Sequence, residues 1–128
     1  MQRSQRLTGS KRFSQIHTEG SSVANRLLVM RYLANETDYS RFGFLVNKRI
    51  GNATKRNKVK RRLRDAVRMN LVKAGWDALF IVRRGGGSAY YQDLKDATDN
   101  LLQRANLLEK PPQPTGSGLI LERSLGAL

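Results

Sequence analysis

Ten of the 21 residues from 48 to 68 are Lys or Arg, and Asp65 is the only acid among them. Such a concentration of like charge destabilises a compact state through self-repulsion, so it calls for a partner of opposite charge. Nucleic acid is the commonest polyanion, and basic side chains bind it by releasing its condensed counterions. This run therefore predicts electrostatic binding of phosphate groups.

The rest of the composition supports the same class of partner. The chain of 128 residues has a formal net charge of +14. Residues 1–75 hold 18 Lys and Arg against 4 Asp and Glu, whereas residues 76–128 hold 6 of each, so the whole excess lies in the first part. Cysteine is absent, which excludes disulfides, thiol catalysis and Cys-ligated zinc. No apolar run approaches the roughly 20 residues of a membrane span, and binding to a membrane surface is the lesser interpretation.

Residues that could catalyse hydrolysis are sparse. Nucleases use clustered carboxylates that hold metal ions, or a His that acts as acid and base. The single histidine, His17, has no second acid–base group to work with. Asp93, Asp96 and Asp99 recur every three residues and could hold a metal, but a solvated acidic face is the favoured interpretation. Glycines 85–87 lack the Gly-Lys-Ser/Thr context of a phosphate loop. We therefore predict no catalytic residue and no metal site in the protein itself.

The elements that precede the basic run are predicted from local patterns. Ser10 could cap a short helix that Gly20 ends. Residues 23–33 are rich in Leu, Val, Met and Tyr and indicate a strand, and residues 41–47 indicate a second one. Because only a short turn cluster at residues 35–38 separates these two strands, we expect them to pair antiparallel.

The basic run itself is predicted to be a long helix. Thr54 is a candidate N-cap, and the helix would continue to about residue 74, with Gly75 as its stop. Apolar residues step by three or four positions and make one stripe, which leaves a wide cationic face. The stripe consists of Val59, Leu63, Ala66, Val67, Leu71 and Ala74.

The remaining pattern completes the fold. Residues 76–82 read as a strand buried on both faces, glycines 85–87 as a flexible loop, and residues 89–108 as a last helix. The order helix, strand, strand, helix, strand, helix predicts a single-domain α+β sandwich with a mixed sheet of about three to four strands. We expect residues 1–9 to be a flexible N-terminus, residues 10–110 to form the RNA-binding domain, and the proline-rich residues 111–128 to be a disordered tail.

Several side chains could contact nucleic acid besides the Lys and Arg that bind phosphate. Asn57 could bond a phosphate or a base, or could bond the backbone of its own helix. Phe13 and His17 are four residues apart and share a helix face, and Phe42 and Phe44 share a strand face. Aromatic rings beside basic residues can stack unpaired bases, at about 1–3 kcal/mol each. Core packing is the favoured alternative for Phe44, and both interpretations stay open for Phe13.

The basic run also resembles a known family signature. Residues 47–53 (NKRIGNA), followed by residues 55–65 (KRNKVKRRLRD), resemble the signature of the bacterial ribonuclease P protein family. That pattern is a Lys-Lys strand end, Gly-x-Ala, then Arg-Asn-Arg-x-Lys-Arg-x-x-Arg. The resemblance covers about residues 6–108. It departs from the family at Lys58, where the second Arg of the signature is expected, and at His17, where a second Phe is common.

The resemblance implies a function that composition alone could not give. Catalysis would belong to a large RNA with bound Mg²⁺, and the protein would carry no cofactor of its own. The protein would bind ribonuclease P RNA and the 5′ leader of precursor tRNA in the cytoplasm, with no small-molecule substrate and no membrane. It would assist the endonucleolytic removal of the leader that gives the mature tRNA 5′ end. The implied fold is an α/β sandwich similar to a ribosomal-protein domain, with a left-handed crossover.

Two sets of candidate residues follow. The set for the catalytic RNA is Arg56, Asn57, Lys58, Lys60, Arg61, Arg62, Arg64 and Arg68. The set for the leader or precursor-tRNA cleft is Phe13, His17, Phe44, Lys48, Arg49, Arg83 and Arg84. The alternatives are a ribosomal or other structural RNA-binding protein, a duplex-DNA binder that uses the long helix, and, last, an autonomous hydrolase.

Overall fold

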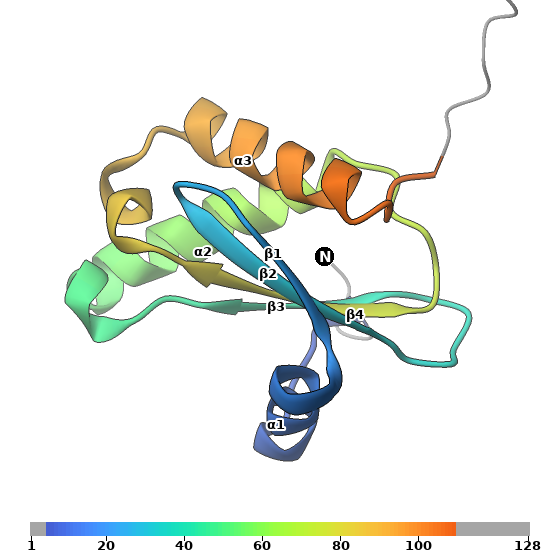
Figure 1. The fold of residues 1–128 in the computed structure, drawn as a ribbon. Helices are drawn as coiled ribbons and strands as arrows, with labels where there is room; N and C mark the ends of the chain where they lie inside the picture. The colour runs from blue at the N-terminus through green and yellow to red at the C-terminus, as the bar shows by residue number, and fades with distance from the viewer. Residues whose placement is uncertain (1–4, 110–128) are drawn as a thin grey trace, which may run out of the picture.

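The computed structural model describes residues 5–109, so the predictions for residues 1–4 and for the tail 111–128 lie outside the described residues. Three α-helices, four strands and two 3₁₀ turns make up this part of the chain (Figure 1). In chain order they are α1 (Ser10–Glu19), β1 (Ser21–Ala24), β2 (Leu28–Ala34), β3 (Arg41–Leu45), η2 (Lys48–Ile50), α2 (Ala53–Arg68), β4 (Trp76–Val82), η3 (Arg84–Ser88) and α3 (Tyr91–Arg104).

The four strands form one mixed sheet in the order β1-β2-β4-β3. Strand β4 pairs antiparallel with β2 and parallel with β3, and α2 provides the crossover between β3 and β4. The prediction of a mixed α+β sandwich is therefore confirmed. The predicted antiparallel pairing of the strands before and after the 35–38 turn is wrong, because β4 lies between β2 and β3.

The single strand predicted at residues 23–33 is two strands, β1 and β2, which form a hairpin. Asn25 makes the turn between them. Its side-chain oxygen accepts hydrogen bonds from the backbone N–H groups of Leu27 and Leu28, at 3.2 and 3.0 Å. An Asn side chain that bonds the backbone two residues ahead replaces a ladder bond and reverses the chain.

The helix boundaries differ from those predicted. Asn52, rather than Thr54, caps α2, because its side chain accepts from the N–H of Lys55 at 2.9 Å. The helix ends at Arg68 rather than at residue 74, since the next segment bonds the chain that follows α3: the N–H of Lys73 donates to the carbonyl of Leu107 at 2.7 Å. At the start of α1 the N-cap position belongs to Gly9, and Ser10 is the first helical residue.

Two later elements also differ from those predicted. Glycines 85–87, expected to be a flexible loop, lie within the 3₁₀ turn η3. The last helix, expected over residues 89–108, spans Tyr91–Arg104. The strand Trp76–Val82 has the predicted bounds, and five of its seven residues are buried.

Helices cover both faces of the sheet. Figure 1 shows α2 and α3 on one face and α1 alone on the other. The main core lies between the sheet and α2 and α3, where Phe80, Leu28, Met30, Leu63 and Leu101 are fully buried. A smaller cluster of Leu7, Ile16 and Leu79 lies under α1. Strand alternation sends even-numbered residues of β4 to the first cluster and odd-numbered ones to the second.

The segment before α1 runs along the sheet edge. Residues 5–9 belong to the stretch expected to be flexible; Leu7 within it is buried, and its N–H donates to the carbonyl of Phe42 at 2.8 Å. At the opposite end of α1, Gly20 allows a close approach between helix and sheet, because a Cβ there would lie 2.5 Å from the carbonyl oxygen of Ile16 and 2.9 Å from that of Tyr32.

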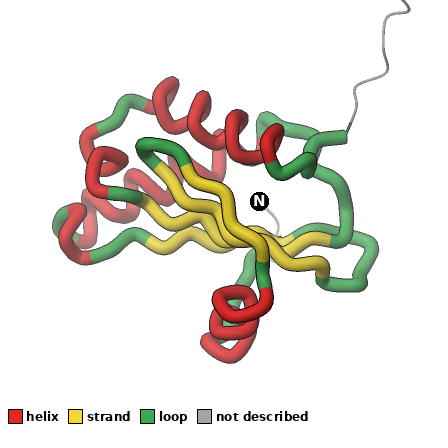
Figure 2. The backbone as a smooth tube through the Cα atoms, viewed as in Figure 1, coloured by secondary structure: helices red, strands yellow, loops and turns green. Residues whose placement is uncertain are grey.

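Two long connections, residues 35–40 and 69–75, lie at the same end of the sheet (Figure 2). The N–H of Asn35 in the first donates to the carbonyl of Gly75 in the second, at 2.9 Å. Neither connection lies near the beginning of α2, so the basic run begins at the other end of the sheet. No helix among residues 5–109 has the length and apolar character that crossing a bilayer requires.

Candidate nucleic-acid interface

Helix α2 holds its basic residues on a rigid element. Its buried residues are Val59, Leu63, Ala66 and Val67, which confirms the predicted apolar stripe as far as the helix extends. The basic side chains lie off this stripe, and Lys58, Arg61 and Arg68 are exposed. Within residues 5–109, the bond from Arg68 to Asp65 is the only ion pair on α2. The helix therefore presents cationic charge that the fold itself largely leaves uncompensated.

Some of the candidate residues on α2 also hold the fold together. The Nε of Arg56 donates to the carbonyl of Gly51 at 3.2 Å, and Nη1 of Arg62 donates to the carbonyl of Ala89 at 3.3 Å. The guanidinium of Arg64 lies over the ring of Phe44. Asn57 is exposed, and the capping role in this region belongs to Asn52. Asn57, Lys58 and Arg61 are thus the most openly presented of the set.

A groove runs between α1 and the strand ends on the other face of the sheet. It has a volume of about 320 Å³, and Phe13, His17, Leu45, Leu79 and Ile81 contribute to its lining. His17 is exposed, Phe13 is half-buried, and 41% of Leu45 is exposed. The structure therefore brings together the two predicted aromatic residues of α1. It adds three aliphatic residues that sequence analysis missed, although alternation along β3 and β4 could have found them.

Phe44 does not belong to this groove. Its side chain points to the opposite face of the sheet and stacks on Phe80, with 5.7 Å between ring centroids. Its exposed edge lies in a smaller hollow at the margin of β3, which Phe13, Lys60 and Arg64 also line. Phe44 therefore packs in the core, as the favoured interpretation held, and the structure separates it from His17.

The basic residues predicted for the cleft gather where β3 and β4 end. Parallel strands finish at the same edge of a sheet, so η2 follows β3 and η3 follows β4 side by side. Arg49 and Arg84 line a hollow of about 510 Å³ between them. Lys48 and Arg83 are exposed, and Nη1 of Arg83 donates to the carbonyl of Asn25 at 2.8 Å. This end also holds the beginning of α2.

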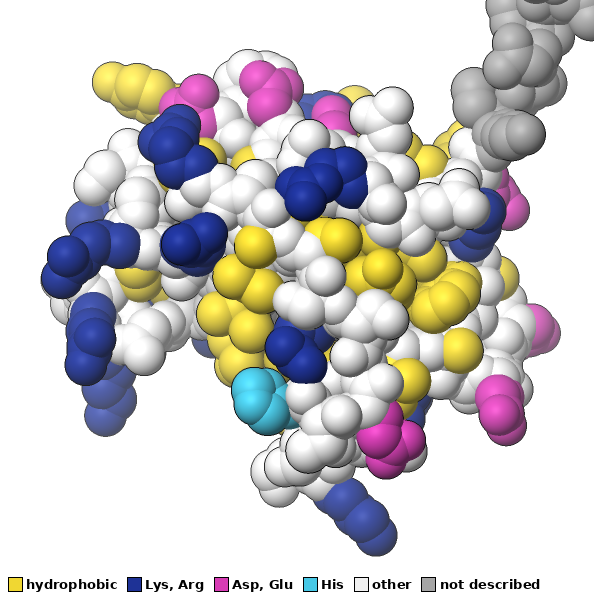
Figure 3. All heavy atoms as spheres, in the orientation of Figure 1, with side chains coloured by type: hydrophobic (Ala, Val, Ile, Leu, Met, Phe, Trp, Pro, Cys, Tyr) yellow, Lys and Arg dark blue, Asp and Glu magenta, His cyan; other side chains and the backbone are white. Residues whose placement is uncertain are grey.

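Charge separates along the molecule in the view of Figure 3. Lys and Arg side chains gather at the end where η2 and the first turn of α2 lie, and acidic side chains gather over α3 and at the opposite end. His17, in cyan, lies between the two regions beside apolar surface.

The acidic residues of α3 each have a separate local partner. Asp93 accepts from the N–H of Tyr90, Asp96 from the side chain of Gln92, and Asp99 from Lys95 at 2.7 Å. The bond to Asp99 raises the pKa of Lys95. Within residues 5–109, no group of three or more His, Asp or Glu side chains is arranged to hold a metal ion.

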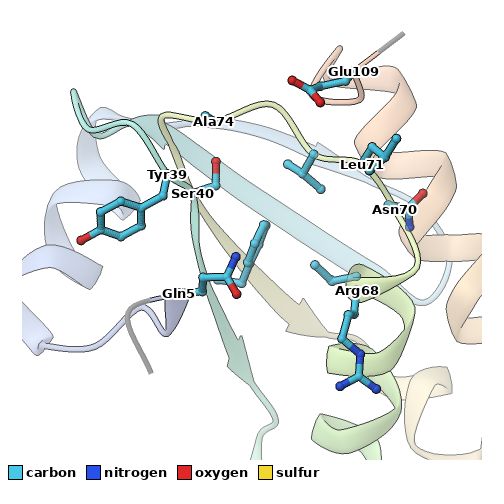
Figure 4. Close-up of a pocket in the computed structure, with 11 residues that line it drawn as sticks. Gln5, Tyr39, Ser40, Arg68, Asn70, Leu71, Ala74 and Glu109 are labelled. Atoms are coloured by element: carbon cyan, nitrogen blue, oxygen red, sulfur yellow. The ribbon is translucent and has the colours of Figure 1, made fainter. Parts of the chain in front are cut away.

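A second hollow of about 320 Å³ lies at the far end of the sheet (Figure 4). Its polar groups already serve the fold. The hydroxyl of Ser40 donates to the carbonyl of Lys73 at 2.6 Å and accepts from the N–H of Trp76, while Asn70 bonds Ala66 and Asp99. Of the residues predicted to bind RNA, only Arg68 lines it.

One buried acid was not anticipated. Asp77 begins the odd-numbered face of β4 and is 0% exposed, under α1. Burial raises the pKa of Asp77, but hydrogen bonds from Arg41, Asn35 and Arg12 outweigh this, and the pKa lies below its usual value. The same carboxylate raises the pKa of Arg41. A single Asp inside an apolar strand is the sequence signal that could have found it, because buried acids are rarely unpaired.

These features define the class of protein: a small α+β sandwich that exposes a basic helix on one face of its sheet and, on the other face, a groove lined by aromatic and aliphatic side chains. The sequence pattern of the family described as Ribonuclease P matches residues 1–106. A Dehalococcoides mccartyi protein named Ribonuclease P protein component is 34% identical over 117 residues, covering 91% of this chain and 98% of that protein. A Clostridioides difficile protein of the same name is 37% identical over 98 residues, covering 74% and 86%.

Two solved structures of ribonuclease P proteins are also similar to this chain. The Staphylococcus aureus RNase P protein superposes with a TM-score of 0.76 at 30% identity, covering 82% of this chain and 98% of that one. The RNase P protein from Thermotoga maritima gives a TM-score of 0.72 at 33% identity, covering 77% and 96%. The chain belongs to the ribonuclease P protein family. It is an accessory subunit of the ribonuclease P endoribonuclease, which acts in tRNA processing, and its partner in that ribonucleoprotein is an RNA.

Proposed function

We propose that the two surfaces described above bind two different RNAs. The basic face of α2, with the exposed Asn57, Lys58 and Arg61 and the half-buried Lys60, binds the catalytic ribonuclease P RNA through its phosphates. The groove of Phe13, His17 and Leu45 holds the single-stranded 5′ leader of precursor tRNA. Lys48, Arg49, Arg83 and Arg84 neutralise the phosphates where the leader enters or leaves.

One observation carries this proposal: the groove ends at the strand termini from which the basic residues project. Leu45 lies in the groove, and Lys48 and Arg49 follow it after one short turn. Ile81 lies in the groove, and Arg83 follows it on the same side of β4 by strand alternation. Unpaired bases stack on aromatic and apolar side chains while the backbone tracks a positive groove, which is the usual way of binding single strands.

The chemistry in this proposal belongs to the RNA. The protein screens phosphate repulsion between two RNAs and holds the leader, and so raises substrate affinity without touching the scissile bond. Mg²⁺ would be held by the RNA of the holoenzyme. We place the complex in the cytoplasm, where tRNA precursors are made.

Reconstitution with catalytic RNA at low Mg²⁺ tests the proposal. Precursor tRNAs with a long and a minimal leader are compared by equilibrium binding and by single-turnover cleavage. Phe13→Ala should weaken binding of the long-leader substrate by at least about fivefold, the loss of one stacked base, and leave the minimal-leader substrate unchanged. Equal effects on both substrates would show that the groove does not bind the leader. Cleavage of precursor tRNA by the protein without RNA would contradict the proposal that the RNA carries out the chemistry.

A further inference from the structure

The buried carboxylate of Asp77 receives four hydrogen bonds from three side chains. Arg41 donates through Nε and Nη2 at 2.8 and 2.6 Å, Arg12 through Nε at 2.7 Å, and Asn35 through its amide at 2.9 Å. Asp77 and Arg41 are register partners on β4 and β3, whereas Arg12 is on α1. One acid therefore ties the lone helix to the two strands beneath it.

Arg12 immediately precedes Phe13, so its ion pair with Asp77 anchors the turn of α1 that carries the aromatic ring. One turn later, Ile16 is fully buried against Leu7 and Leu79. At the last turn, Nη2 of Arg31 donates to the carbonyl of His17. The helix is thus held at three points along its length: by the ion pair of Arg12 beside Phe13, by the buried side chain of Ile16, and by the bond to the carbonyl of His17.

We propose that Asp77 is a positioning residue for the leader, acting through Arg12 to set the place of α1 on the sheet. Its position fixes the distance between Phe13 on the helix and Leu45 and Ile81 on the strands, which is the width of the groove. This rests on the proposed function of the groove. Asp77 lies under α1 and touches no RNA itself.

The two arginines that share Asp77 provide a matched pair of variants. Arg12→Gln disconnects α1 and leaves Arg41 paired, while Arg41→Gln removes the same charge and leaves α1 connected. In full-length protein assembled with catalytic RNA, Arg12→Gln should weaken binding of a long-leader precursor about tenfold, the equivalent of one lost stacked base. Arg41→Gln should leave leader dependence unchanged. Equal changes in the two variants would overturn the positioning role.

Two further measurements exclude a simple charge effect. If Arg12 contacted a leader phosphate, Arg12→Gln would lower the salt slope of binding by about one unit, and that result would overturn the proposal. Asp77→Asn removes a negative charge, which by itself strengthens binding to RNA. The positioning role requires the opposite, weaker binding of the long leader, and stronger or unchanged binding contradicts it. If Asp77→Asn does not fold, the comparison of Arg12→Gln with Arg41→Gln tests the positioning role by itself.

An RNA-free readout separates this inference from the function of the groove. Phe13 packs against the Leu79 cluster, so NMR contacts between its ring and the methyl groups of Leu79 should weaken in Arg12→Gln and persist in Arg41→Gln. If the contacts persist in both, Asp77 does not position α1. If Phe13→Ala has no effect on leader binding while the contacts respond as expected, the groove's function fails and the leader part of this inference falls with it.

Discussion

The guanidinium carbon of Arg64 lies 5.9 Å from the centroid of the Phe44 ring. Beneath it, that ring stacks on Phe80 with an interplanar angle of 14°. The cation, the ring and the core residue come from α2, β3 and β4, so this stack joins the basic helix to both strands of the parallel pair. Cation–π contacts of this partly exposed kind contribute about 0.5–1 kcal/mol.

Phe44→Leu should therefore lower stability without affecting the leader. Losing the stack on Phe80 and part of the apolar contact should reduce the free energy of unfolding by about 1–3 kcal/mol, measured by urea denaturation. Long- and minimal-leader substrates should bind the variant in the wild-type ratio, because Phe44 stacks on Phe80 and does not line the groove of Phe13, His17 and Leu45. Phe13→Leu is the matched control, expected to change that ratio. A changed ratio in Phe44→Leu would place Phe44 in the leader site after all.

Arg61→Ala should weaken assembly with the catalytic RNA. Arg61 is exposed on α2, so its loss should lower the salt slope of the protein–RNA affinity by about one unit. Lys95→Ala on α3 removes the same charge from a residue paired with Asp99, and its slope should stay at the wild-type value. Equal slopes for both variants would mean that net charge, rather than the face of α2, governs binding.

Thr98→Val should stabilise the protein. Thr98 is 0% exposed on α3, and its hydroxyl has no hydrogen-bond partner among the described residues. Replacing an unsatisfied buried hydroxyl with a methyl group of similar shape should raise the free energy of unfolding by about 1 kcal/mol. Thr18→Val is a control at an exposed position, where the hydroxyl bonds the backbone carbonyl of Ser14. A loss of stability in Thr98→Val would show that the hydroxyl finds a partner in solution.

Asp77 should make stability depend on pH in the acid range. Its pKa is lower in the folded protein than in the unfolded chain, where it is about 3.9. The folded state therefore prefers the ionised form, and this contribution is complete above the unfolded-state value and is lost as the pH falls toward the folded-state value. Urea titrations should show wild type and Asp77→Asn converging on acidification. A constant difference between the two from neutral to acid pH would argue against the ion pairs.

Local patterns predicted the elements that carry the site better than they predicted the sheet. The stripe Val59, Leu63, Ala66 and Val67 fixes α2 and its basic face, and the apolar run 76–82 fixes β4, because each signal lies within one element. Strand pairing depends on residues far apart in the sequence. Nothing near residues 35–38 shows that β4 will separate β2 from β3.

The groove likewise combines residues that local spacing predicts with residues that only the tertiary fold brings together. Phe13 and His17 could be placed on one face from their spacing alone. Their neighbours Leu45, Leu79 and Ile81 come from strands that only the tertiary fold brings beneath α1. The resemblance to the family signature predicted the basic residues at the strand ends. The role of Asp77 depends on contacts between α1, β3 and β4, which are far apart in the sequence, so no local pattern predicts it.

The central place of β4 governs when the sheet can form. Strands β2 and β3 each bond β4 and do not bond each other. A nascent chain therefore has no complete sheet until residue 82 has left the ribosome, while its first 75 residues already carry the entire excess of positive charge. Until then, the positively charged first 75 residues lie beside ribosomal RNA without β4, the strand that joins β2 to β3. The sheet of this cationic chain is completed only when β4 pairs with both β2 and β3.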